Sequence, residues 1–166
     1  EFAAEAWPII PRSVWREARA ETHDLARYEQ KLEIIGTDLD GEILKVARRN
    51  AAEAGVDELI HFQRMDVRDV RTKRKYGYLI TNPPYGERLG EWKQVSRLYA
   101  EMGRTFAALD TWSFYIITSD EEFEQHFGRK ASKKRKLYNG NIKVDYYQFF
   151  GPKPPRPASA APTKQV

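Results

Sequence analysis

Short apolar runs alternate with amphipathic segments along most of this chain, and this alternation restricts the possible folds more than any other feature. The runs suit buried strands, and the segments between them repeat apolar residues at helical spacing. The predicted strands cover residues 32–37, 59–62, 76–81 and 112–118, and the predicted helices cover residues 12–30, 41–54, 91–109 and 120–127. Strands that alternate with helices indicate an α/β fold with a mostly parallel sheet.

Three of these elements carry further detail. The run 32–37 is almost continuously apolar, which is typical of a strand buried on both faces of a sheet. Asp40 suits the N-cap of the next helix, and Gly55 suits its end. The helix over 91–109 is expected to bury one stripe of side chains, namely Val95, Leu98, Met102 and Phe106.

The C-terminal part predicts an antiparallel hairpin and then a tail. Residues 136–139 and 143–150 flank Asn139-Gly140-Asn141, a sequence that favours a tight turn between two strands. A length of 166 residues and an apolar content of 41% are enough for one domain with a hydrophobic core. We place this domain at residues 1–150. Residues 151–166 are rich in Pro and Ala, and we expect them to form a flexible tail.

The most specific motif is Asn82-Pro83-Pro84-Tyr85, which directly follows the apolar strand that ends near residue 81. Two prolines fix two φ angles and remove two backbone donors, so the strand stops abruptly and a rigid turn begins. In an open α/β sheet, ligands bind at the carboxyl ends of the strands. The motif therefore predicts a binding loop, although a plain strand-to-loop turn with an exposed tyrosine is the simpler alternative.

This turn suits the binding of an amino group on a planar base. The side-chain oxygen of Asn82 and the carbonyl of Pro83 can accept the two protons of an exocyclic NH2 group, while Tyr85 stacks on the base. These hydrogen bonds would draw the nitrogen lone pair out of conjugation and direct it at an electrophile. The motif thus predicts a reaction at an exocyclic amine.

The longer string from Asn82 to Arg88, Asn-Pro-Pro-Tyr-Gly-Glu-Arg, resembles motif IV of the amino-methyltransferases. It is most similar to the branch that carries a THUMP RNA-binding domain and makes N2-methylguanosine in ribosomal or transfer RNA. The resemblance covers about residues 1–150 and implies a Rossmann-like, S-adenosylmethionine-dependent methyltransferase. It assigns catalysis to Asn82, Pro83, Pro84 and Tyr85, and contacts with the substrate to Tyr85, Gly86 and Arg88.

The same resemblance implies residues that bind the cofactor. Asp38 follows an apolar strand at the position where family members bind the ribose hydroxyls of S-adenosylmethionine. Asp66 matches the position that accepts a hydrogen bond from the adenine amino group, and Asn82 lies where the methyl donor and the target amine meet. Two carboxylates are suitable acceptors for a diol and an amine.

One element of the family is not found in this sequence. Family members begin the catalytic domain with a strand and a glycine-rich loop around the methionine end of the cofactor, and neither occurs here. We therefore expect that this chain is a fragment, that the absent strand lies in mid-sheet beside residues 34–37, and that the fragment alone is inactive.

Positive charge is concentrated near the expected hairpin. The chain has 28 Lys and Arg residues against 24 Asp and Glu, and four consecutive cations stand out: Lys133, Lys134, Arg135 and Lys136. Such a cluster indicates contacts with the phosphates of a nucleic acid, although a solvated basic loop has the same composition. The expected partner is RNA, and ribosomal RNA is the preferred type.

Several classes of protein are disfavoured. The chain has no cysteine, which removes disulfides and thiolate zinc sites, and its three histidines show no ligand spacing, so we expect no metal. No apolar run approaches the length of about 18 residues that a membrane span needs, which favours a cytoplasmic protein.

Three functions remain open. The first is methylation of guanine N2 in ribosomal RNA. The second keeps the fold but methylates adenine N6 in DNA or RNA, because the motif recognises an amine and not a particular base. The third is a catalytically inactive, Rossmann-like fragment that only binds RNA.

Overall fold

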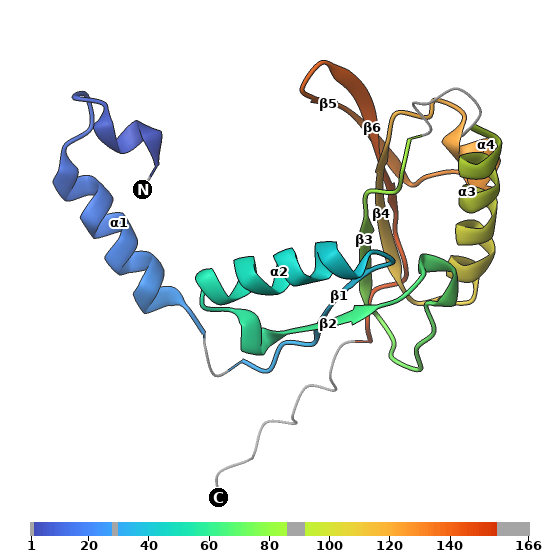
Figure 1. Ribbon diagram of the computed structural model, residues 1–166, viewed down its shortest axis with the longest axis horizontal. Helices are drawn as coiled ribbons and strands as arrows, with labels where there is room; N and C mark the ends of the chain where they lie inside the picture. The colour runs from blue at the N-terminus through green and yellow to red at the C-terminus, as the bar shows by residue number, and fades with distance from the viewer. Residues whose placement is uncertain (1, 28–29, 86–91, 156–166) are drawn as a thin grey trace, which may run out of the picture. The chain divides into compact units, whose positions relative to one another are not determined.

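A computed structural model describes residues 2–27, 30–85 and 92–155 (Figure 1). The chain forms two compact units, one of Glu1–Gly36 with Asp40–Gln63 and one of Thr37–Leu39 with Arg64–Val166. In chain order the elements are η1 (Ala3–Ala6), α1 (Arg12–Leu25), β1 (Ile34–Asp38), α2 (Gly41–Glu53), η2 (Asp57–Leu59), β2 (Ile60–Arg64), η3 (Val67–Asp69), β3 (Tyr78–Thr81), α3 (Trp92–Ala107), β4 (Ser113–Thr118), α4 (Phe123–Phe127), β5 (Lys133–Asn139) and β6 (Ile142–Phe149), where η marks a 3-10 helix.

The first unit contains α1, α2 and most of β1 and β2, which pair as a two-stranded sheet; the last residues of both strands, 37–38 and 64, belong to the second unit. Helix α2 has both predicted ends: the Asp40 side chain accepts a hydrogen bond from the Glu42 amide at 2.8 Å, and Gly55 follows the helix with a φ of +68°. Helix α1 is shorter than predicted. It ends at Leu25 because Ala26 turns to an extended conformation.

The expectation that residues 32–37 form a strand buried on both faces is wrong. Ile34 and Ile35 are 44% and 55% exposed. The physical reason is the number of neighbours, since β1 pairs only with β2 within the described residues. Strand β3 likewise pairs only with β4 there, and its Ile80 is 75% exposed. That an additional strand lies beside β1 stays a prediction.

The second unit contains a four-stranded sheet in the order β3-β4-β6-β5. Strands β3 and β4 are parallel, whereas β6 runs antiparallel to both β4 and β5. The predicted hairpin is confirmed, but β5 begins at Lys133 and not at residue 136. The basic cluster is therefore part of a strand, where successive side chains point to opposite faces.

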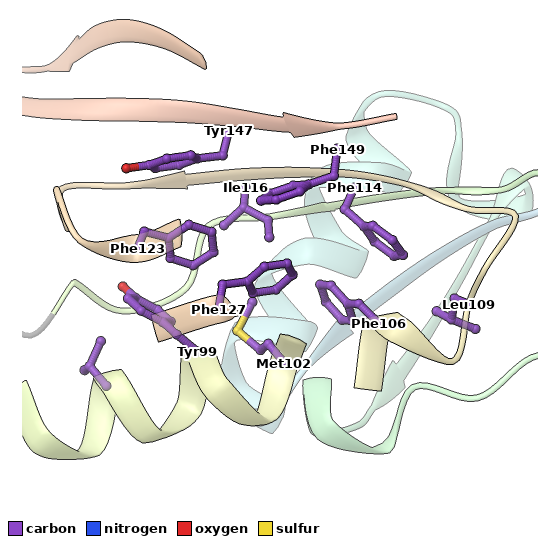
Figure 2. Close-up of a cluster of buried hydrophobic side chains, with 11 residues drawn as sticks. Tyr99, Met102, Phe106, Leu109, Phe114, Ile116, Phe123, Phe127, Tyr147 and Phe149 are labelled. Atoms are coloured by element: carbon purple, nitrogen blue, oxygen red, sulfur yellow. The ribbon is translucent and has the colours of Figure 1, made fainter. Parts of the chain in front are cut away.

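Helices α3 and α4 lie on one face of this sheet (Figure 1). Every second residue of β4 is buried against them, and β6 adds large aromatic side chains to the same layer (Figure 2). The core members are Val95, Tyr99, Met102, Phe106, Leu109, Phe114, Ile116, Phe123, Phe127, Tyr147 and Phe149. The predicted stripe of α3 is confirmed at three positions, but Tyr99 and not Leu98 occupies the fourth fully buried place.

The close contact between α3 and α4 depends on Gly103. A Cβ atom there would lie 2.0 Å from the backbone oxygen of Phe127. We expect Gly103→Ala to lower the free energy of unfolding by about 2 kcal/mol or more, although Ala is the better helix former, because the two backbones must separate. Urea unfolding measures this. Gly41→Ala is the control, since a Cβ at Gly41 meets nothing within 4 Å, and an equal loss there would contradict the account.

Residues 151–155, which follow β6, form no helix or strand. The remainder of the predicted tail, residues 156–166, lies outside the described residues.

Candidate active site

The loop after β3 holds the four residues of the predicted catalytic motif. Pro83 is buried, Tyr85 is half-buried, and Asn82 and Pro84 are exposed. Neither proline has a backbone N–H, so the loop has few donors with which to stabilise itself. Its conformation must therefore depend on hydrogen bonds that its carbonyls and side chains accept.

The structure brings Asn82 and Tyr85 together. The Tyr85 hydroxyl donates a hydrogen bond to the Asn82 side-chain oxygen at 2.7 Å. This oxygen is the acceptor that we predicted for the target amine. An amide oxygen has two lone pairs, so one remains available for a ligand. The bond also limits where the aromatic ring of Tyr85 can lie.

A second hydrogen bond joins the loop to helix α3. The hydroxyl of Tyr99, on α3, donates to the Pro84 carbonyl at 2.7 Å and also contacts Thr118 Oγ1 at 2.9 Å. Burial raises the pKa of Tyr99 to about 12. Neither Tyr99 nor Thr118 was predicted from the sequence to contact the loop. The helical spacing of Tyr99 from Val95 and Met102 was a signal for its burial, but nothing in the sequence indicates its contact with the loop.

Asp66 caps the short helix η3 and forms an ion pair. Its side chain accepts a hydrogen bond from the Arg68 amide at 2.8 Å, and both its oxygens contact the Arg68 guanidinium. The hydrogen bonds from the Arg68 side chain and amide hold the pKa of the Asp66 carboxyl below its usual range. Arg68 also reaches Glu101 of α3 at 3.2 Å. Arg68, which was not predicted from the sequence as a site residue, fixes the orientation of this carboxylate.

Asp38 lies at the end of β1, and its backbone approaches the segment of Asp66. The Asp38 carbonyl accepts a hydrogen bond from the Met65 amide at 3.1 Å, and Arg64 Nε donates to the Leu39 carbonyl at 2.7 Å. The Asp38 residue itself is exposed. The structure thus places the two predicted cofactor carboxylates on neighbouring segments of the second unit.

The predicted substrate contacts are described only in part. Gly86 and Arg88 lie outside the described residues. Lys134 is engaged within the hairpin, because its amino group contacts Asp145 Oδ2 and the Tyr147 hydroxyl, each at 3.1 Å. The other three cations of the cluster are exposed and have no ion-pair partner in the part of the chain that the structure describes, namely Lys133, Arg135 and Lys136.

A shallow cavity of about 290 Å³ lies between η3 and α3. Three cations line it, Arg68, Lys93 and Arg97, together with Gln94, Leu98 and Glu101. Since Glu101 is paired with Arg68, the two cations of α3 give the cavity a positive charge.

Two negative findings concern the described residues. None of the described helices is both long enough and apolar enough to cross a membrane. In ranges 2–27, 30–85 and 92–155, no three His, Cys, Asp or Glu side chains gather where they would hold a metal ion.

Comparison with known proteins gives a consistent picture. The model of a family described as the RMKL-like methyltransferase domain matches residues 2–148. The chain is 49% identical over 150 residues to a Bacillus subtilis (strain 168) protein named "Putative RNA methyltransferase YpsC", covering 90% of this chain and 39% of that protein. It is 36% identical over 149 residues to the ribosomal RNA large subunit methyltransferase K/L of Shewanella baltica (strain OS185), covering 87% of this chain and 21% of that protein.

A solved structure agrees with these relatives. The crystal structure of SMU.472 in complex with SAH superimposes with a TM-score of 0.83 at 48% identity, covering 93% of this chain and 41% of that one. The chain therefore spans well under half the length of each of these proteins. The similarity confirms the predicted α/β, Rossmann-like fold.

Proposed function

Because this chain belongs to the RMKL-like methyltransferase domain family, we propose that it methylates an exocyclic amine of an RNA base, with S-adenosylmethionine as the methyl donor. The preferred target is guanine N2 of ribosomal RNA. The observation that carries the proposal is the hydrogen-bonded pair of Asn82 and Tyr85 on the proline loop after β3. It joins an acceptor for an amine to an aromatic ring that can stack on a base.

The residues on the cofactor side fit S-adenosylmethionine in their chemistry. Asp38 is exposed at the end of β1, and a carboxylate is a suitable acceptor for the two ribose hydroxyls. Asp66 accepts three hydrogen bonds from Arg68, and a carboxylate has about four lone-pair sites, so about one site remains on Oδ2 for the adenine amino group. When bound, S-adenosylmethionine supplies a strongly electrophilic methyl group.

The loop residues orient the substrate. Asn82 Oδ1 accepts one proton of the amine through its free lone pair, and the Pro83 carbonyl accepts the other. Tyr85 contacts the face of the base and keeps its hydroxyl on Asn82. Such positioning of two reactants accounts for a large share of the catalysis that this site needs. The amine loses its proton to solvent after the transfer.

Analysis of the product tests this proposal. The full-length gene product is incubated with S-adenosylmethionine and with ribosomal RNA from a strain that lacks the gene, and the RNA is then digested and analysed by mass spectrometry. We expect N2-methylguanosine. Detection of N6-methyladenosine would mean that the substrate is adenine and not guanine, and the mechanism would stay the same. No methylated nucleoside and no binding of S-adenosylmethionine would contradict the function and favour a module that only binds RNA.

The three exposed cations of β5 are the proposed contacts with RNA phosphates. Replacing Lys133, Arg135 and Lys136 together by Ser is expected to weaken RNA binding for all sequences. The slope of the logarithm of the binding constant against the logarithm of the salt concentration should become shallower by about 2 to 3. The base that is methylated stays the same, because phosphate contacts do not read sequence. Filter binding at several salt concentrations measures the effect.

Lys134→Ser is the matched control within the same strand. Because it removes the ionic partner of Asp145, which is 6% exposed, we expect a loss of stability with little change in the salt slope. If the triple variant kept the parent's affinity and salt slope, β5 would not be an RNA-binding surface.

A further inference from the structure

We propose that Tyr99 is a positioning residue, which holds the loop of residues 82–85 in the conformation required for methyl transfer. This inference rests on the function proposed above for the loop. Tyr99 is not expected to touch the substrate or the cofactor, and it acts through the carbonyl of Pro84.

The hydrogen bonds around Tyr99 have a defined direction. A carbonyl has no proton, so Tyr99 must donate to Pro84, and its oxygen is then left to accept the proton of Thr118. Thr118 Oγ1 in turn accepts a hydrogen bond from the Asp120 amide at 3.1 Å. A continuous chain of hydrogen bonds therefore leads from the turn after β4 to the loop.

Asp120, where this series of hydrogen bonds begins, is itself held by further hydrogen bonds. The Asp120 carboxylate accepts a hydrogen bond from the Glu122 amide at 2.8 Å and contacts His126 Nδ1 at 2.7 Å, and the residue is 3% exposed. Buried polar groups that all have partners make a rigid support. The loop is thus attached to a buried and fully hydrogen-bonded part of the second unit.

Burial keeps Tyr99 in its donating form. The residue has no exposed surface, and its ring packs edge-on against Phe123, which lies between Tyr99 and Tyr147 (Figure 2). Because burial raises the pKa of Tyr99 to about 12, the hydroxyl retains its proton throughout the physiological range.

The hydrogen bond from Tyr99 to Pro84 supports the hydrogen bond between Tyr85 and Asn82. Tyr99 fixes the peptide unit of Pro84, from which Tyr85 begins, and Tyr85 then contacts Asn82. If Pro84 were released, both the ring and the amide oxygen would gain freedom. A displacement of about 1 Å in a catalytic group can reduce a rate by about 10²-fold.

Tyr147 provides a matched control for the test. It is also fully buried, it packs on the same Phe123, and its hydroxyl donates to a backbone carbonyl, that of Asp120, at 3.0 Å. Tyr99→Phe and Tyr147→Phe therefore remove the same chemical group from the same core, and Tyr147→Phe also removes a hydrogen-bond partner of Lys134. Only the first removes a hydrogen bond to the loop.

Steady-state kinetics on the full-length gene product, with ribosomal RNA from a strain that lacks the gene, tests the proposal. We expect Tyr99→Phe to lower kcat by at least about 10-fold while the dissociation constant for S-adenosylmethionine changes less than about 2-fold. Tyr147→Phe is expected to keep kcat within about 2-fold. Equal losses of kcat in the two variants, or no loss in Tyr99→Phe, would overturn the proposal.

A second measurement uses this chain alone and separates the inference from the proposed function. In NMR spectra of protein labelled with ¹⁵N-asparagine, Tyr99→Phe should shift or broaden the side-chain amide signal of Asn82, and Tyr147→Phe should leave it unchanged. An unchanged signal in Tyr99→Phe overturns the inference even if the parent methylates RNA. A parent that methylates no RNA contradicts the proposed function whatever the spectra show.

Discussion

Asn82→Ala is expected to lower the rate of methyl transfer by about 10²-fold or more and to change the affinity for S-adenosylmethionine by only a few-fold. The substitution removes the oxygen that accepts a proton of the target amine, and groups that position a reacting atom have effects of this size. Single-turnover transfer of a radiolabelled methyl group to ribosomal RNA by the full-length gene product measures the rate. Turnover close to that of the parent would contradict the assigned role.

Tyr85→Phe separates the two roles of the Asn82 oxygen. In the structure this oxygen also accepts the hydrogen bond from the Tyr85 hydroxyl, so Asn82→Ala releases the tyrosine as well. Tyr85→Phe breaks the same hydrogen bond but leaves the amide and an aromatic ring in place. We expect it to lower the rate by about 10-fold, which is clearly less than the loss for Asn82→Ala. A loss as large as that of Asn82→Ala would mean that Asn82 serves only to hold Tyr85.

Asp38→Ala is expected to have the opposite pattern, with weaker binding of S-adenosylmethionine and a smaller effect on the transfer step. A lost hydrogen bond to a charged group costs about 1.5–3 kcal/mol, which corresponds to about 10- to 150-fold in affinity. Isothermal titration calorimetry on the full-length gene product measures the dissociation constant. An unchanged value would make Asp38 an ordinary residue at the end of β1.

Asp40→Ala is the control for this measurement. Asp40 lies two residues further along the chain, and its side chain caps α2 through the Glu42 amide. We expect its removal to lower the free energy of unfolding by about 1 kcal/mol, as for other N-cap residues, without a change in cofactor affinity. If both variants lost the same affinity, the effect would come from the local structure and not from the Asp38 carboxylate.

Local chemistry made part of the fold predictable. The cap at Asp40, the end of α2 near Gly55 and the hairpin turn each depend on residues close together in the sequence, and all three are confirmed. The buried face of α3 follows from helical spacing. The motif from Asn82 to Tyr85 ended β3 as expected, because the prolines remove backbone donors.

Partners distant in the sequence account for what was wrong or missed. The burial of β1 depends on neighbouring strands, which its apolar residues cannot specify. The contact of Tyr99 with Pro84 spans 15 residues, and that of Lys134 with Asp145 and Tyr147 depends on the register of β5 and β6. In each case the sequence indicates the type of side chain but not the atom that it meets.

A crystal structure of the full-length gene product with SAH and guanosine monophosphate tests the central claim most directly, because it locates the target amine. The account predicts that the exocyclic N2 lies within about 3.2 Å of both Asn82 Oδ1 and the Pro83 carbonyl, with the ring of Tyr85 stacked on the base. A base bound elsewhere, or an amine directed away from Asn82 and from the cofactor, would contradict it.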